Sequence, residues 1–192
     1  VGPCGETELW SADGKRLAVW FHPGRQKTGV NLNEEEGPVL EEHMKHTLVV
    51  AGSWRSTSGG VLGEDVRFDF LVGPVDHTLP MMEKWQITAP KSGSREPLLV
   101  HFDEPLDTAM LASALQLWHE GKPWPLRVNV DQSGKVWEGL PGKIWTPGSY
   151  HLKADPLLED LAGNNLMHPF EVDATQGEKS SRAALERIVT LP

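Results

Sequence analysis

The sequence has little cysteine, little positive charge and no long apolar run. A single cysteine, Cys4, excludes an internal disulfide and a cysteine-based zinc site. The formal charge of −9 argues against a nucleic-acid binder, which needs a basic face, and against attraction to an anionic membrane surface. No apolar run approaches the roughly 20 residues that span a bilayer. A length of 192 residues suits one large domain or two small ones.

Helical periodicity is also scarce, whereas turn-forming residues are abundant. Glycine and proline make up 34 of the 192 residues and are spread along the chain. Short apolar runs lie between them, and Val66-Arg67-Phe68-Asp69-Phe70 alternates so that its apolar side chains share one face of a strand. Short strands separated by turns predict an all-β sandwich or barrel. We expect strands within residues 16–21, 47–51, 66–72, 85–89, 97–102, 126–130 and 149–154.

Three further segments have a distinct local pattern. Residues 117–124 predict a hairpin with Gly121 at its tip. Residues 107–115 fit one or two helical turns, and residues 177–189 predict a C-terminal helix with apolar residues on one face. Residues 73–82 contain two prolines and no periodicity, which indicates a domain boundary.

Two segments 104 residues apart resemble each other, residues 46–62 and residues 150–166. Identical residues fall opposite each other at three positions: Leu48 and Leu152, Gly59 and Gly163, Leu62 and Leu166. The flanking features recur in the same order, because Val19-Trp20 and Val136-Trp137 both precede a Pro-Gly pair and a basic residue. The pattern predicts a duplicated domain.

The first copy differs from the second in two ways. It carries an insertion with the acidic run Asn33-Glu34-Glu35-Glu36, which we interpret as a solvated loop. It also has few residues before Trp20 to supply opening strands. The first sandwich is therefore either truncated or assembled differently, and a truncated sandwich leaves an open sheet edge that invites pairing with another chain.

Three motifs in the second copy follow one another in a recognisable order. Leu98-Leu99-Val100-His101-Phe102-Asp103-Glu104-Pro105-Leu106-Asp107 is followed by Pro147-Gly148-Ser149-Tyr150 and by Asp160-Leu161-Ala162-Gly163-Asn164. This order resembles bacterial Ig-like domains of the S-layer-protein type over residues 82–173, and it is degenerate over residues 16–72.

The resemblance implies tandem Ig-like β-sandwiches of about seven strands each. The first is expected over residues 1–74 and is degenerate or truncated, the second over residues 82–173, with a tail, expected to be helical, over residues 174–192. It further implies a non-enzymatic spacer, interaction or adhesion module of a secreted or cell-surface bacterial protein, located outside the cell or in its envelope. Its expected partners are other domains of the same larger protein, a cell-surface protein or a glycan, and no cofactor is expected.

The acidic segment 155–166 has two interpretations. Asp155, Glu159, Asp160 and Asn164 offer the oxygen ligands that calcium prefers. The alternative is a structural turn in which Asp155 caps a single helical turn, Gly163 ends it in the left-handed conformation, and leucines tuck under the sandwich. The first copy has serine and arginine in place of the acids, which favours the structural turn.

Other candidate sites are weaker. His43 and His46 have a zinc-compatible spacing without a third ligand, and His101, Asp103 and Glu104 lie together at a strand end. Catalytic motifs are lacking, so we expect no enzyme activity.

Eight tryptophans against one tyrosine are unusual. Trp118, Trp124 and Trp145 are candidates for stacking on sugar rings, which makes a carbohydrate-binding accessory module of a secreted enzyme the alternative function. The competing interpretation is that most indoles are buried, with Trp20 and Trp137 as a core pair.

Overall fold

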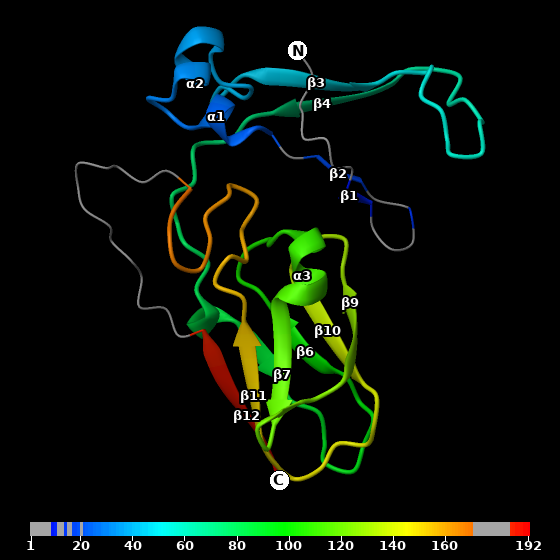
Figure 1. Cartoon of the computed structure of the whole chain (residues 1–192), viewed down its shortest axis with the longest axis vertical. Helices are drawn as coiled ribbons and strands as arrows, with labels where there is room; N and C mark the ends of the chain where they lie inside the picture. Colours follow the sequence, from blue (N-terminus) through cyan, green and yellow to red (C-terminus); the bar gives the residue numbers. More distant parts are fainter. Residues whose placement is uncertain (1–8, 11–13, 15–16, 20, 171–184) are drawn as a thin grey trace. The chain divides into compact units, whose positions relative to one another are not determined.

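The computed structural model describes residues 9–10, 14, 17–19, 21–170 and 185–192. The chain forms two compact units (Figure 1). The first contains the described residues between 19 and 76, and the second contains the described residues within 77–192 and within Leu9–Ala18. In the part of the chain that the structure describes, none of the helices has the length and hydrophobicity needed to cross a membrane.

The second unit contains two antiparallel sheets of four strands, ordered β5-β6-β10-β9 and β12-β11-β7-β8. This is the A-B-E-D and G-F-C-C′ order of an immunoglobulin-like sandwich, so the all-β prediction is confirmed. Its elements are η1 (Met82–Lys84), β5 (Gln86–Thr88), β6 (Leu98–His101), α3 (Thr108–Ala114), β7 (Leu115–His119), β8 (Lys122–Pro123), β9 (Leu126–Val130), β10 (Val136–Pro141), β11 (Gly148–Ala154) and β12 (Glu186–Leu191). The short strands β1 (Leu9–Trp10) and β2 (Leu17–Ala18) pair with each other.

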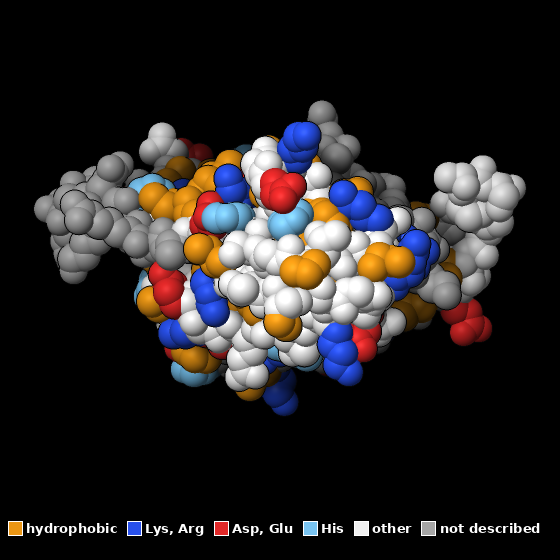
Figure 2. All heavy atoms as spheres, turned by 90° about the horizontal axis from the view of Figure 1, so that it is seen from below, with side chains coloured by type: hydrophobic (Ala, Val, Ile, Leu, Met, Phe, Trp, Pro, Cys, Tyr) orange, Lys and Arg blue, Asp and Glu red, His pale blue; other side chains and the backbone are white. Residues whose placement is uncertain are grey.

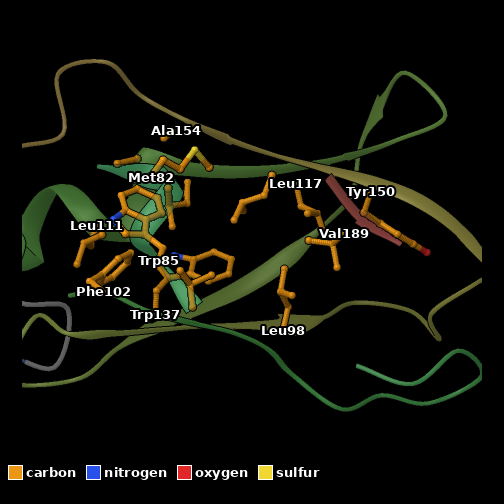
Figure 3. Close-up of a cluster of buried hydrophobic side chains, with 14 of the residues drawn as sticks. Met82, Trp85, Leu98, Phe102, Leu111, Leu117, Trp137, Tyr150, Ala154 and Val189 are labelled. Carbon is orange, nitrogen blue, oxygen red and sulfur yellow. The ribbon is translucent and has the colours of Figure 1, made fainter. Parts of the chain in front are cut away.

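The core of the second unit lies between the two sheets (Figure 3). Alternate residues point inward, as Leu115 and Leu117 do on β7 and Tyr150 and Leu152 do on β11. Trp137 on β10 is fully buried among them. Because burial of one large apolar side chain contributes about 1.5–3 kcal/mol, this single cluster from both sheets is the main stabilising feature of the unit.

Two local predictions for this unit are confirmed. The helix expected within residues 107–115 is α3, and the Asp107 side chain caps it by accepting hydrogen bonds from the backbone N–H groups of Ala109 (2.7 Å) and Met110 (2.9 Å). The hairpin expected at Gly121 joins β7 to β8. Glu120 (φ 51°) and Gly121 (φ 73°) both adopt the left-handed conformation that a two-residue hairpin turn requires.

The C-terminal tail corrects two expectations. The helix expected over residues 177–189 is wrong where the structure describes it, because β12 is a strand that pairs with β11 along six positions. The sandwich therefore extends beyond residue 173 to include β12.

The first unit consists of α1 (Pro23–Gln26), α2 (Asn31–Glu36), β3 (Lys45–Val50) and β4 (Val66–Leu71). Strands β3 and β4 form a two-stranded antiparallel ribbon where a degenerate or truncated sandwich is expected, and loop 51–65 connects them (Figure 1). No apolar side chain is buried in the described part of this unit. The acidic run expected to be a loop is instead α2, where Glu36 pairs with Arg25 at 2.7 Å.

Candidate functional site

The acidic turn brings two of its four candidate ligands together. Asp160 and Asn164 are buried, with 5% and 0% of their surface exposed. One carboxylate oxygen of Asp160 accepts hydrogen bonds from the backbone N–H groups of Ala162 (2.8 Å) and Asn164 (2.9 Å). The other oxygen accepts from the Asn164 side-chain amide at 2.8 Å, and the Asn164 amide oxygen accepts from the Phe170 N–H at 2.9 Å. These two side chains thus hold residues 160–170 in place.

The other two candidates are Asp155 and Glu159. Asp155 is exposed, and its carboxylate accepts from the Leu157 N–H at 2.9 Å. Among the described residues, the carboxylates of Asp155, Glu159 and Asp160 do not form a group within 4.8 Å of one another. The three carboxylates therefore do not form one cluster, and a calcium site built from the four residues stays a prediction.

The expected helical turn at Asp155 is a single β-turn, closed by a hydrogen bond from the Leu158 N–H to the Asp155 carbonyl at 3.0 Å. Leucines of this segment were expected to tuck under the sandwich; Leu158 is fully buried, whereas Leu157 and Leu161 are 63% and 74% exposed. The left-handed glycine is Gly163, with φ 88°, as expected.

The corresponding turn in the first unit has the same backbone geometry. Gly59, 104 residues before Gly163, has φ 86°. The Ser56 hydroxyl accepts from the Gly60 N–H at 3.0 Å, as the Asp160 carboxylate accepts from the Asn164 N–H at 2.9 Å. The flanking isolated bridges, Arg55 with Val61 and Glu159 with Asn165, are also 104 residues apart. The shape of this turn therefore does not require a carboxylate.

Two of the three tryptophans that are candidates for sugar stacking, Trp124 and Trp145, lie in an aromatic cluster. Trp124 and Trp145 are 6% and 2% exposed, and their rings stack with centroids 5.5 Å apart. Tyr150 meets both rings edge-on, and His119 stacks on Tyr150 at 4.1 Å. Trp124 and Trp145 therefore belong to the core, as the competing interpretation of buried indoles has it. Trp118 is half-buried, with the Lys153 ammonium 5.0 Å from the centre of its ring.

Tyr150 also closes the loop that precedes β11. Its hydroxyl donates to the Thr146 carbonyl at 3.0 Å and accepts from the Thr146 N–H at 3.1 Å. A tyrosine at the start of strand F that bonds to the backbone a few residues upstream is a hallmark of immunoglobulin-like sandwiches. The sequence motif predicts a tyrosine at this position but carries no signal for its hydroxyl contacts.

The remaining candidates, His43, His46 and Asp103, contact neighbouring side chains of the fold. His43 lies 3.1 Å from the Glu42 carboxylate, and His46 stacks on Phe70 with ring centroids 5.8 Å apart. In the described part of the chain, neither histidine belongs to a group of three metal-ligating side chains. Asp103, beside the exposed His101, is 3.7 Å from the Lys84 ammonium.

Charge is mixed on the face drawn in Figure 2, where basic and acidic side chains are interspersed. That face offers no continuous basic stripe for a phosphate backbone.

No protein-family model matches this chain, and no curated protein matches it. Among solved structures, a crystal structure of the S-layer protein rSbsC (31–844) is similar at 18% sequence identity with a TM-score of 0.34. The similarity covers 43% of this chain and 12% of that protein. The chain thus matches only a small part of that protein's length, and a likeness of this size does not identify a function.

Proposed function

We propose that this chain is a non-enzymatic structural module of a larger bacterial cell-surface protein assembled from immunoglobulin-like sandwiches. One observation carries the proposal. The same strand and turn recur 104 residues apart, with left-handed glycines at Gly59 (φ 86°) and Gly163 (φ 88°). A strand and turn repeated along one chain support a role as a spacer, because a repeated copy adds length without adding chemistry.

The way polar side chains are used in the second unit supports the same proposal. Asp107 caps a helix, Asp160 and Asn164 hold the acidic turn, and Tyr150 closes the loop before β11. Each of these groups satisfies backbone or neighbouring amides. Such contacts stabilise a fold, whereas a catalytic group must reach a substrate.

Surface labelling of intact cells of the source organism tests the proposal. Antibodies raised against residues 77–192 should stain unpermeabilised cells, and external protease should remove the signal. Staining that appears only after permeabilisation would contradict a cell-surface role.

The alternative function, a carbohydrate-binding accessory module, loses support from the burial of Trp124 and Trp145. A glycan array decides between the two. We expect no saturable binding, whereas binding that is lost in a Trp118→Ala variant would favour the alternative.

A further inference from the structure

Strand β12 is held along its whole length by its neighbour β11. The two strands are paired at six positions, from Glu186 at the start of β12 to Leu191 at its end. Val189 and Leu191 point into the core and are 6% and 2% exposed. β12 can therefore leave the sandwich only when the hydrogen bonds of this ladder break and two buried side chains are withdrawn.

The side chain of Arg187 fastens the start of β12 to the helix η1. Its Nη1 donates to the Met82 carbonyl at 2.8 Å. The carbonyls of Glu83 and Trp85 also accept from it, each at 3.3 Å. Hydrogen bonds from a charged donor are stronger than those between neutral groups. Because Met82 and Trp85 are buried, with 0% and 2% of their surface exposed, Arg187 ties β12 to a segment that is itself anchored in the core.

Helix η1 and the C-terminus lie at opposite ends of β12 (Figure 1). Arg187 is the second residue of β12, whereas Pro192 directly follows its last residue. A load that draws Met82 and Pro192 apart therefore acts along the strand. Backbone hydrogen bonds of an antiparallel pair lie perpendicular to the strands, so this load strains all of them together. A load that separates the two strands from one end would break them one after another.

We propose that the second unit is a force-bearing module, in which β12 and Arg187 form a clamp against tension along the chain. Sliding of β12 toward the C-terminus is opposed by its ladder with β11 and by the contacts of Arg187 with η1. This role rests on the proposed function, because a spacer carries the tension that acts along its chain. Resistance to force is nevertheless a property of the purified protein, so it is measured without reference to where the protein resides.

Optical tweezers measure the clamp in the full chain, with Cys4→Ser and handles attached through pairs of cysteine substitutions. His77→Cys with Pro192→Cys pulls along β12 and leaves the first unit outside the loaded segment. Pro147→Cys with Pro192→Cys pulls the ladder apart at the end beside Gly148. The three handle positions are exposed. At the same force, unfolding should be about tenfold slower or more in the first geometry, because six pairs resist together rather than in turn.

Arg187→Ala isolates the contribution of the guanidinium. In the His77 geometry this variant should unfold about tenfold faster than wild type at the same force, because charge-assisted hydrogen bonds are lost. In the Pro147 geometry its rate should stay within about twofold of wild type, since the ladder opens at Gly148 before the load reaches Arg187. Arg127→Ala on β9 is the matched control and should change neither rate, because Arg127 is exposed and lies in the other sheet.

Equal unfolding rates of the chain in the two geometries overturn the proposal, and this comparison needs no substitution at Arg187. An Arg187→Ala effect of the same size in both geometries also overturns it, because a merely stabilising side chain acts whatever the direction of the force. Staining of cells only after permeabilisation contradicts the cell-surface role but leaves these rates unchanged, so the two failures are distinguishable.

Discussion

Replacing Gly163 with alanine should destabilise the second unit by about 2–5 kcal/mol. The backbone of Gly163 has φ 88°, a conformation that costs an L-residue about 1–2 kcal/mol. A Cβ at this position would also lie 2.7 Å from Cδ2 of Phe170 and 3.2 Å from its Cγ. Carbon atoms in contact are normally about 3.5–4.0 Å apart, so the ring must move, which adds about 1–3 kcal/mol.

Gly93→Ala is the matched control. Gly93 has φ 78°, but nothing lies within 4 Å of a Cβ built there, so alanine should incur only the backbone cost of about 1–2 kcal/mol. Urea unfolding followed by tryptophan fluorescence measures both variants. With a slope of about 2 kcal/mol per molar urea, the extra cost of Gly163→Ala should lower its midpoint by about 0.5–1.5 M relative to Gly93→Ala.

A double-mutant cycle isolates the contact with the ring. In a Phe170→Ala background the Cβ that Gly163→Ala introduces has no ring to meet, so most of the extra cost should disappear. Equal midpoints for the Gly163→Ala and Gly93→Ala variants would refute the reasoning, and so would an extra cost that persists without Phe170.

Three further predictions follow from the hydrogen bonds of the second unit. Asp160→Ala should lower the free energy of unfolding by about 2–4 kcal/mol, because buried donors lose their acceptor. Asp160→Ser should restore part of that stability, and urea unfolding of both variants measures the difference. Tyr150→Phe should cost about 1–2 kcal/mol in the same assay by removing the contacts with Thr146, and an unchanged midpoint would contradict this. The hydrogen bond from His151, at 2.5 Å, holds the pKa of Glu186 below its ordinary 4.5, so this contact is lost as pH falls through the lowered pKa. His151→Ala should raise the pKa of Glu186 in an NMR titration, and an unchanged value would contradict the assignment.

Strand alternation made much of the second unit predictable from sequence, because apolar and polar residues take opposite faces of a strand. β9 (Leu126–Val130) lies where the pattern predicts it. The C-terminal tail misled because its apolar residues at positions 185, 188 and 189 also fit one face of a helix. Pairing of Ile188 and Val189 with β11 overrides that local preference, and a contact so distant in sequence leaves no local signal.

The backbone conformation of the candidate site was predictable from the sequence, but the burial of its side chains was not. Residue types alone identified Gly163 as a left-handed position, because glycine adopts positive φ without strain. They did not show that Trp124 and Trp145 face the core, since indoles suit both a buried cluster and an exposed rim. That choice depends on how two loops fold back onto the sandwich, because Trp124 directly follows β8 and Trp145 lies between β10 and β11.

The turn at Asp160 carries a carboxylate because of the hydrogen-bond donors that surround it. Asp160 accepts from two backbone N–H groups and from the buried side-chain amide of Asn164. Gly60 stands where Asn164 does and has no side-chain amide, so the hydroxyl of Ser56 suffices for the backbone N–H of Gly60. The carboxylate is therefore matched to a buried amide, and the difference in charge between the two turns arises from burial. The backbone geometry of the turn is alike in both units. The exposure of the turn at Gly59 therefore reflects how that turn is packed and not how its backbone folds.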